Sequence, residues 1–391
     1  MKEGWTYKKL GEVCDCEGGT QPPKSEWIKH PHDGYVRMLQ IRDFTKSREF
    51  EIEYVKITKK LRLCNADDIL IGRYGASVGK ILTGLSGAYN VAIIKSIPDE
   101  KYISKDFIRR FFESTVFQNV LFKVCASRAA QAGFSKDDII DTLIPIPPLS
   151  EQQRIVSRLD AAFAHIDALK ANAEKQLAEA RQLFQAELAE CMKPKEGWAE
   201  KKLKDLCSFV RGPFGGSLKK ESFVSSGFAV YEQQNAIYNK FTFRYFIDEE
   251  KYKAMSRFSV EPGDLIMSCS GTIGKVAIVP EGADKGIINQ ALLKLSPKSI
   301  LDKYYLKYLM ESSFFNVIIA KYSDGAAIKN IASVAILKDI VLSIPSLAIQ
   351  RSIVSRLDAL SANIKKLEEV HRKTLAECDA LKQAMLREVF E

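Results

Sequence analysis

The heptapeptide Ile-Val-Ser-Arg-Leu-Asp-Ala occupies residues 155–161 and occurs again, unchanged, at residues 353–359, a shift of 198 positions. A second match lies upstream. Residues 3–10 and 196–203 share the pattern Glu-Gly-Trp-x-x-Lys-Lys-Leu, in which only the two central residues differ. Repeats at a fixed period indicate architecture before any secondary structure is assigned. The chain is therefore predicted to be a tandem duplication, with a pseudo-twofold relation between its halves.

Each half is predicted to have two parts. Residues 1–148 (the first head) and 193–346 (the second head) are rich in Gly, Pro and aromatic residues and contain short strand-like runs, which predicts mixed α/β domains. Residues 149–192 and 347–391 are rich in Ala, Leu, Glu, Gln, Lys and Arg, which predicts one long helix each. The expected fold class is α+β: two α/β heads separated by two long helices.

Apolar side chains recur at steps of three and four in both helical segments, which is the pattern of a coiled-coil seam. Two equivalent stripes are most simply buried by antiparallel packing, which would hold the heads a fixed distance apart. Further apolar residues off the first stripe, among them Phe163 and Leu177, widen the face enough to cover the heads or a second protein. The expected helix–helix interface consists of Ile155, Leu159, Ile166, Leu169, Ile353, Leu357, Leu360, Ile364, Leu367 and Leu381.

The chain of 391 residues has 58 Lys and Arg against 49 Asp and Glu, a formal charge of +9. The excess belongs to the heads: residues 1–149 hold 23 basic and 19 acidic residues, and residues 193–346 hold 22 and 16. Such an excess suggests a polyanionic partner, although a solvated surface produces it about as often. No apolar run reaches the roughly 18 residues of a membrane span, and the N-terminal residues lack a secretory signal, so a cytoplasmic protein without a membrane partner is expected.

Cysteine and histidine do not form a recognisable metal motif. The eight cysteines are scattered, and the one close pair, Cys14 and Cys16, has a single residue between its members, unlike zinc or dithiol motifs. Four histidines leave little room for a histidine-based metal or general-base site. We expect structural thiols and no metal.

Each head contains a glycine-rich loop that ends in Gly-Lys, at residues 75–80 and 270–275 (the Gly-Lys loops). A nucleotide-binding phosphate loop is excluded, because Ile81 and Val276 stand where that motif requires Ser or Thr. A hydroxyl, backbone amides and one lysine still suit a nucleic-acid phosphate. The alternative is a hairpin with a solvated lysine. The phosphate-binding candidates are Ser77, Lys80, Thr272 and Lys275.

A polar and aromatic segment precedes each Gly-Lys loop and differs between the heads, at residues 35–43 and 231–235. Arginine makes bidentate contacts to guanine, and Asn or Gln to adenine. Divergence between the segments is what two different target sequences would need, although solvated strand-end residues would look similar. The base-reading candidates are Arg37, Gln40 and Arg42 in the first head and Tyr231, Gln233, Gln234 and Asn235 in the second.

The assembled pattern resembles the specificity subunit of type I restriction-modification systems over essentially the entire chain. The residues that carry the resemblance are the Gly-Trp openings, the Gly-Lys loops, and the junction at residues 146–156, a Pro-terminated strand followed by Leu-x-x-Gln and a long helix, with its partner at residues 344–354. The chain departs from the usual pattern at Ala348 and Ile349 of the second junction, and at Val91, where the second head keeps Gln290.

The resemblance implies a non-catalytic reader of double-stranded DNA. Each head would be a target recognition domain for one half of a split asymmetric site, and the helices would set the unread spacer and dock two modification subunits. Those subunits would carry S-adenosylmethionine and methylate adenine, and restriction subunits, where the system has them, would use ATP and Mg²⁺. This chain itself is expected to bind no cofactor. The bases that each head reads do not follow from the sequence.

Two other classes of protein are alternatives. A stand-alone nuclease or methyltransferase would need a carboxylate–metal cluster or a cofactor loop, and adjacent acidic pairs such as Asp67-Asp68 cannot face one ligand from a strand. A coiled-coil interaction scaffold without DNA reading would not need basic heads with a Gly-Lys loop in each. Salt-sensitive retention on DNA would separate this scaffold from a DNA reader.

Overall fold

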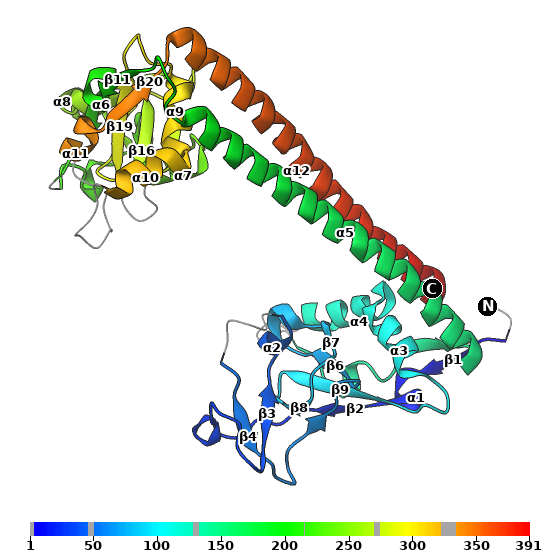
Figure 1. Ribbon diagram of the computed structural model, residues 1–391. Helices are drawn as coiled ribbons and strands as arrows, with labels where there is room; N and C mark the ends of the chain where they lie inside the picture. The colour runs from blue at the N-terminus through cyan, green and yellow to red at the C-terminus, as the bar shows by residue number, and fades with distance from the viewer. Residues whose placement is uncertain (1–3, 46–50, 128–132, 215, 270–273, 322–333) are drawn as a thin grey trace. The chain divides into compact units, whose positions relative to one another are not determined.

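The computed structural model describes residues 4–45, 51–127, 133–214, 216–269, 274–321 and 334–391 (Figure 1). The chain divides into two compact units, Met1–Ala173 with Arg372–Glu391 and Glu174–His371. Each unit therefore combines one head with a stretch of both long helices. Within the described ranges, no helix is long and apolar enough to cross a membrane.

The first head is built from two four-stranded sheets and a two-stranded ribbon, β1-β10. One sheet has the order β2-β9-β6-β7, with all neighbours antiparallel. The other has the order β4-β3-β8-β5, in which β3 and β8 are parallel. The strands are β1 (Thr6–Lys9), β2 (Cys14–Gly18), β3 (Tyr35–Leu39), β4 (Tyr54–Lys56), β5 (Leu63–Cys64), β6 (Ile69–Gly72), β7 (Ile81–Leu82), β8 (Gly87–Tyr89), β9 (Ile93–Pro98) and β10 (Leu143–Ile146).

The second head repeats this topology strand for strand. Its sheets have the orders β12-β19-β16-β17 and β14-β13-β18-β15, with β13 and β18 parallel, and β11 pairs with β20. The duplication therefore extends through the middle of each half, where the sequences hardly match. The strands are β11 (Ala199–Lys202), β12 (Cys207–Arg211), β13 (Phe228–Tyr231), β14 (Phe246–Ile247), β15 (Ser259–Val260), β16 (Leu265–Ser268), β17 (Val276–Ile278), β18 (Gly286–Ile288), β19 (Leu292–Pro297) and β20 (Val341–Ile344).

Short helices cover the sheets and carry most of the aromatic core. Helix α3 begins after Ser104, whose hydroxyl accepts a hydrogen bond from the backbone N–H of Phe107, an N-cap that satisfies one unpaired donor. In the second head Asp302 caps α9 in the same way. The helices of the heads are α1 (Leu10–Val13), α2 (Ile41–Thr45), α3 (Lys105–Glu113), α4 (Thr115–Ala126), α6 (Leu203–Leu206), α7 (Gln233–Tyr238), α8 (Glu249–Ala254), α9 (Lys303–Glu311), α10 (Ser313–Lys321) and α11 (Val334–Asp339).

The long helices are α5 (Leu149–Met192) and α12 (Leu347–Phe390). Within the first unit, Lys382 Nζ lies 2.5 Å from Asp167 Oδ1, and Lys170 forms an ion pair with Asp379. Since the partners of successive α5 residues run backwards along α12, the two segments are antiparallel. The second unit shows the same direction, with ion pairs Arg181–Glu368 and Glu187–Arg356. The predicted antiparallel packing is confirmed within each unit.

The seam between the helices differs from its predicted course at two leucines. Leu169 and Leu381 are 58% and 51% exposed, so their assignment to the helix–helix interface was wrong. The neighbouring side chains of Lys170 and Lys382 are only 23% and 21% exposed, and their ammonium groups pair with a carboxylate on the opposite helix. The remaining predicted residues, Ile155, Leu159, Ile166, Ile353, Leu357, Leu360, Ile364 and Leu367, are buried or half-buried.

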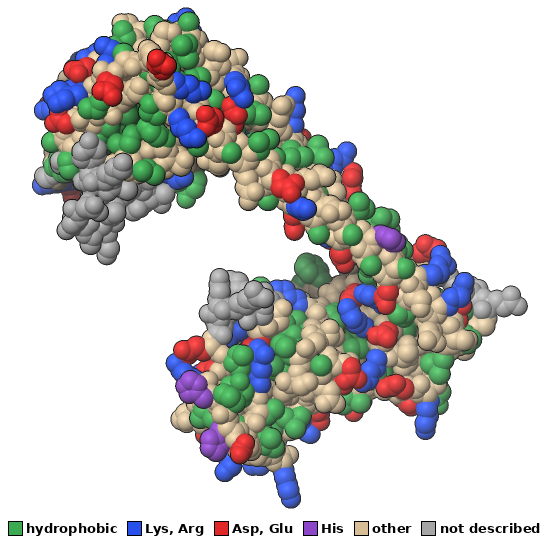
Figure 2. All heavy atoms as spheres, viewed as in Figure 1, with side chains coloured by type: hydrophobic (Ala, Val, Ile, Leu, Met, Phe, Trp, Pro, Cys, Tyr) green, Lys and Arg blue, Asp and Glu red, His purple; other side chains and the backbone are tan. Residues whose placement is uncertain are grey.

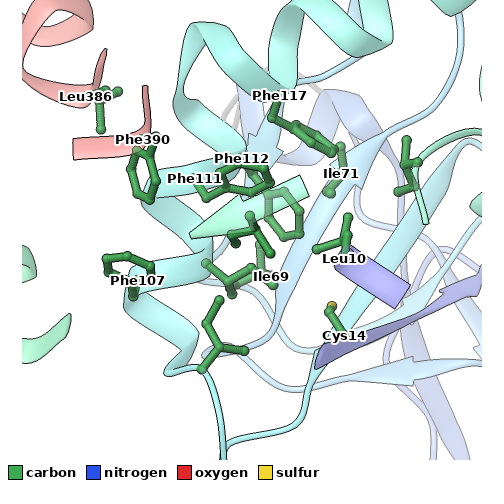
Figure 3. Close-up of a cluster of buried hydrophobic side chains, with 14 of the residues drawn as sticks. Leu10, Cys14, Ile69, Ile71, Phe107, Phe111, Phe112, Phe117, Leu386 and Phe390 are labelled. Atoms are coloured by element: carbon green, nitrogen blue, oxygen red, sulfur yellow. The ribbon is translucent and has the colours of Figure 1, made fainter. Parts of the chain in front are cut away.

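The end of α12 completes the core of the first head (Figure 3). Leu386 and Phe390 point from α12 towards α3, where the Phe390 ring lies 5.2 Å from the ring centroid of Phe107 and 5.5 Å from that of Phe111. Burying an aromatic side chain contributes about 1.5–3 kcal/mol. A segment from the second repeat is therefore part of the first hydrophobic core.

A buried glutamine fastens each long helix to its head. Gln152 is fully buried; its Oε1 accepts a hydrogen bond from the backbone N–H of Ser104 at 2.8 Å, and its Nε2 donates to the carbonyls of Tyr102 and Pro147. Gln350, 198 residues later, makes the same three contacts with Asp302, Ile300 and Pro345. The Leu-x-x-Gln junction thus has a structural role that its sequence did not reveal.

Candidate nucleic-acid interface

Strand ends converge at one edge of the first head. The backbone N–H of Asn90, just after β8, donates to the carbonyl of Leu39, the last residue of β3, at 3.1 Å. The N–H of Arg73, just after β6, donates to the carbonyl of Ala92 at 2.9 Å. These bonds place the segment after β3, the Gly-Lys loop and the β8–β9 turn side by side.

The second head has the same arrangement at the corresponding edge. There Asn289 N–H donates to the carbonyl of Tyr231 at 2.9 Å, and Cys269 N–H donates to the carbonyl of Ala291 at 2.8 Å. In both heads, therefore, the segment predicted to read bases lies at the same edge as the strand end that leads into the Gly-Lys loop. Loops on a rigid sheet edge are a common location for binding sites.

The first Gly-Lys loop is held by its glycines. Gly79 has φ +77° and lies where an added Cβ would be 2.4 Å from Gln118 Oε1, while Gln118 Nε2 donates to the Gly79 carbonyl at 2.9 Å. A side chain at this position would be strained by the left-handed backbone and would have to displace the Gln118 amide. Lys80 is exposed, with no acidic partner among the described residues, and Ser77 is half-buried. The structure thus leaves the Lys80 ammonium available.

The second Gly-Lys loop is described only at its end. Gly274 again has φ +77°, and the backbone N–H of Lys275 donates to Ser268 Oγ at 3.0 Å. The Lys275 side chain is exposed. The other candidate of this loop, Thr272, lies outside the described residues.

Two of the first head's base-reading candidates gather around Glu53. Arg42 Nη2 lies 2.7 Å and Gln40 Nε2 3.1 Å from Glu53 Oε2, and Lys24 Nζ lies 2.5 Å from Oε1. Burial alone would raise the pKa of the Glu53 carboxyl, but the hydrogen bond and charge of Lys24, with Arg42 and Gln40, hold it below its usual value. The Glu53 carboxylate is therefore ionised and holds the side chains of Arg42, Gln40 and Lys24 in position.

The third candidate, Arg37, is tied to a second carboxylate. Arg37 Nη2 lies 2.6 Å from Asp43 Oδ1, and Asp43 Oδ2 accepts a hydrogen bond from the backbone N–H of Gln40 at 2.8 Å. The Arg37 Nε atom is buried without a hydrogen-bond partner among the described residues. The structure therefore brings all three candidates of the first head together, in an arrangement that fixes their positions.

Tyr231 and Asn235 are not available to read bases, and their prediction was wrong. Both are fully buried. The Tyr231 hydroxyl donates to the carbonyl of Asp284 at 2.8 Å. Asn235 Oδ1 accepts from the N–H of Glu232 at 2.7 Å, and its amide nitrogen donates to the Lys240 carbonyl at 2.7 Å, so it caps α7 and closes the following loop. Gln233 and Gln234 are half-buried and remain candidates.

The sequence missed an arginine–glutamate pair at the same edge. Arg244 binds Glu232 through two hydrogen bonds, from Nε to Oε2 at 3.0 Å and from Nη2 to Oε1 at 2.8 Å. The Arg244 side chain is 62% exposed, whereas that of Glu232 is only 14% exposed. The available signal was an arginine inside the aromatic run at residues 241–246, Phe-Thr-Phe-Arg-Tyr-Phe.

Charged side chains of both signs are mixed on the surface, and most thiols are buried. On the face drawn in Figure 2, basic and acidic side chains are interspersed over each unit. In the part of the chain that the structure describes, no group of three His, Cys, Asp or Glu side chains could hold a metal ion. All eight cysteines are free thiols, and seven are buried. Burial raises the pKa of Cys207 to about 12 and that of Cys269 to about 11.

Comparison with known families identifies the class of protein. The profile of the family described as type I restriction modification DNA specificity domain matches residues 2–179 and again residues 195–376. The chain belongs to this family and contains two copies of its domain. The duplicated topology and the paired long helices are the fold of this class.

Named relatives match over most of their length. The type I restriction enzyme EcoBI specificity subunit of Escherichia coli is 23% identical over 422 residues, which cover 100% of this chain and 86% of the relative. The MjaVIII specificity subunit of Methanocaldococcus jannaschii is 22% identical over 411 residues, covering 99% and 92%. These relatives confirm the predicted class, a specificity subunit that is not itself an enzyme.

Solved structures share the fold. A chain from work on complex assembly and conformational transition of the type I R-M system superimposes with a TM-score of 0.77 at 19% identity, covering 100% of this chain and 98% of that chain. The HsdS subunit from Thermoanaerobacter tengcongensis superimposes with a TM-score of 0.57 at 19% identity, covering 100% and 97%. The predicted fold class is confirmed.

Proposed function

We propose that this chain reads a bipartite, asymmetric site on double-stranded DNA, with one head on each half of the site. The observation that carries the proposal is the repeated edge. In both heads the strand end that leads into the Gly-Lys loop lies at the same edge as the segment that follows β3 or β13, while the side chains of these two segments differ. A common scaffold with different edge residues is what two unrelated half-sites require.

Each residue type at this edge has its own proposed role. Ser77, Lys80, Thr272 and Lys275 bind phosphates, which position the heads without reading sequence. Arg37, Gln40, Arg42, Gln233 and Gln234 are the proposed base-reading residues.

The long helices are the proposed spacer and docking surface. In this division, residues 1–148 and 193–346 are target recognition domains, and residues 149–192 and 347–391 set the unread spacer and bind two modification subunits. Restriction subunits join where the system contains them. The cofactors of the reaction, S-adenosylmethionine, ATP and Mg²⁺, belong to those partners, and the complex acts on DNA in the cytoplasm.

A domain exchange tests the proposal. Residues 193–346 are replaced by the corresponding domain of a relative, and the variant is expressed with its modification subunit in cells whose methylated sites are then mapped by sequencing. We expect one half of the methylated motif to change and the other half to stay. The reciprocal exchange of residues 1–148 is the matched control and should change the opposite half. A simultaneous change of both halves would contradict independent reading.

A further inference from the structure

Each head contains an arginine–glutamate pair that links the turn after β3 or β13 to the neighbouring segment. The acid and the base come from opposite segments in the two heads. Gln40 directly follows β3 and Glu232 directly follows β13, so the two residues are equivalent. Each donates its backbone N–H to the side chain three residues later, which is Asp43 at 2.8 Å in the first head and Asn235 at 2.7 Å in the second. In the second head the acid, Glu232, is on this turn. In the first head the turn carries Gln40 and the base, Arg42.

The opposite member of each pair comes from the neighbouring strand. Met38 N–H donates to the carbonyl of Glu53 at 2.8 Å just before β4, and Val230 N–H donates to the carbonyl of Tyr245 at 2.9 Å just before β14. Glu53 therefore corresponds to Tyr245, the neighbour of Arg244. The place of the pair is retained while the positions of acid and base are reversed, so the two heads present their arginines from different segments.

The second pair holds its arginine rigidly. Glu232 occupies Nε and Nη2 of Arg244, so the N–H groups that remain are both of Nη1 and the second of Nη2, and no described residue binds them. The guanidinium lies 5.4 Å from the ring centroid of Tyr245, which stacks on Phe223 at 4.5 Å. The edge formed by Nε and Nη2 is fixed, and the adjoining edge formed by Nη1 and Nη2 is free for a planar, bidentate acceptor.

These pairs differ from ordinary surface ion pairs. In the pair Lys253–Glu249 on α8 both side chains are about 70% exposed, and such pairs add little to stability. The carboxylates of Glu232 and Glu53 are only 14% exposed, so each acid is largely withdrawn from water while its arginine stays more accessible. This is the arrangement that positions an arginine for an external partner.

We propose that Arg244 in the second head and Arg42 in the first are the side chains that read guanine, and that Glu232 and Glu53 are their positioning residues. The inference rests on the proposed function and deepens it, because it names one base in each half-site. Bidentate contact with O6 and N7 of guanine is the most common specific contact of arginine in the major groove.

The test uses the chain together with its modification subunit, in cells whose methylated sites are mapped by sequencing. The variants are Arg244→Ala, Arg244→Lys and Glu232→Gln, with Arg42→Ala and Glu53→Gln for the first head. We expect Arg244→Ala to lose discrimination at a single G·C pair of one half-site by on the order of 10- to 100-fold, with the other half-site unchanged. Arg42→Ala should relax a single G·C pair in the opposite half-site.

The positioning role has its own readout. Glu232→Gln should relax the same base pair as Arg244→Ala but less strongly, and Arg244→Lys should not restore discrimination, because lysine keeps the charge and loses the bidentate geometry. Lys253→Ala is the matched control and should leave the motif unchanged. The unaffected half-site in each variant reports that the chain is folded and assembled.

The outcomes that overturn the inference are separate from those that overturn the proposed function. An unchanged motif in Arg244→Ala, a half-site without a G·C pair, or effects of Arg244→Ala and Glu232→Gln at different base pairs would each refute it. Uniform loss of methylation at all sites in every variant would assign the pairs a purely structural role. A wild-type chain with no two-part motif would refute the proposed function and this inference together.

Discussion

Arg110 and Tyr308 occupy the same position in α3 and α9, and each binds the aspartate of its copy of the repeated heptapeptide. Arg110 Nε lies 3.0 Å from Asp160 Oδ1, and the Tyr308 hydroxyl donates to Asp358 Oδ1 at 2.6 Å. Burial, and then the hydrogen bond to Asp358, raises the pKa of Tyr308. The contact between a head and its long helix is thus retained while its chemistry changes from an ion pair to a neutral donor.

This contact can be weakened without repacking the core. Tyr308→Phe removes only the hydroxyl, so we expect the second unit to lose about 1 kcal/mol of unfolding free energy. Tyr304→Phe in the same helix, where the side chain is 45% exposed, should change it by less than about 0.5 kcal/mol. Urea unfolding measures both. Equal effects of the two substitutions would show that the bond to Asp358 does not stabilise the unit.

The buried glutamines should be far more sensitive. Gln152→Ala leaves the Ser104 N–H and two carbonyls without partners in the protein interior, so we expect a loss of about 3 kcal/mol. Gln350→Ala should cost a similar amount in the second unit. The exposed neighbour Gln153, replaced by Ala, is the control. A loss below about 1 kcal/mol for Gln152→Ala would mean that water replaces the amide.

The lysines of the Gly-Lys loops should act on all DNA sequences alike. If Lys80 and Lys275 bind phosphates, each change to Ala should weaken binding about equally for specific and non-specific duplexes and lower the salt slope of the assembled complex by roughly one unit. Binding isotherms over a range of salt concentrations measure this. Lys253→Ala serves as the control. Selective loss on one half-site, with an unchanged slope, would show that the lysine reads a base.

The spacer prediction concerns α5. Inserting four residues between Ala171 and Asn172 lengthens that helix by roughly 6 Å, close to two base pairs at about 3.4 Å of rise. Four residues nearly preserve the apolar stripe, so we expect a folded, less stable variant that methylates the same half-sites across a longer spacer. Mapping of methylated sites measures the spacer. An active variant confined to the original spacer would show that the helices do not set the separation.

The thiols should react according to burial. Because thiolate is the reactive form, Cys64 and Cys269, whose burial raises their pKa to about 11, should resist iodoacetamide at about pH 8, as should Cys207 with a pKa of about 12. Cys125 is the one thiol that is not buried and should be labelled first. Peptide mass spectrometry locates the label, with the guanidinium-unfolded chain as the control. Rapid labelling of Cys207 in the folded chain would contradict this.

The fold could be predicted because the duplication retains the residues that build it. The repeated heptapeptide and the helical segments without Gly or Pro predicted two heads and two long helices, and both are present. The seam was misplaced where a leucine and a lysine are adjacent, as at Leu169 and Lys170, because hydrophobicity alone selects leucine. Lys170 is more buried than Leu169 and pairs with Asp379 on the other helix, and that pairing is not visible in local sequence.

The site was predicted in location but only partly in its residues. The edge was found because a polar segment after a strand differs between the repeats. Tyr231 and Asn235 were misassigned because the residue type alone does not distinguish a buried side chain that closes a turn from an exposed side chain that could contact a base. Arg244 was missed because its partner, Glu232, lies twelve residues away in sequence and meets it only when β14 pairs with β13.

The packing of Phe390 on Phe107 has a consequence for synthesis on the ribosome. The first unit needs residues 372–391, which are made about 200 residues after Ala173. At about 5–20 residues per second, this is a delay of roughly 10 to 45 s. During that interval the face of α3 that receives Phe390 and Leu386 has no cover from α12. The nascent first head therefore exposes apolar surface until translation is nearly finished, and it should be a client of ribosome-associated chaperones.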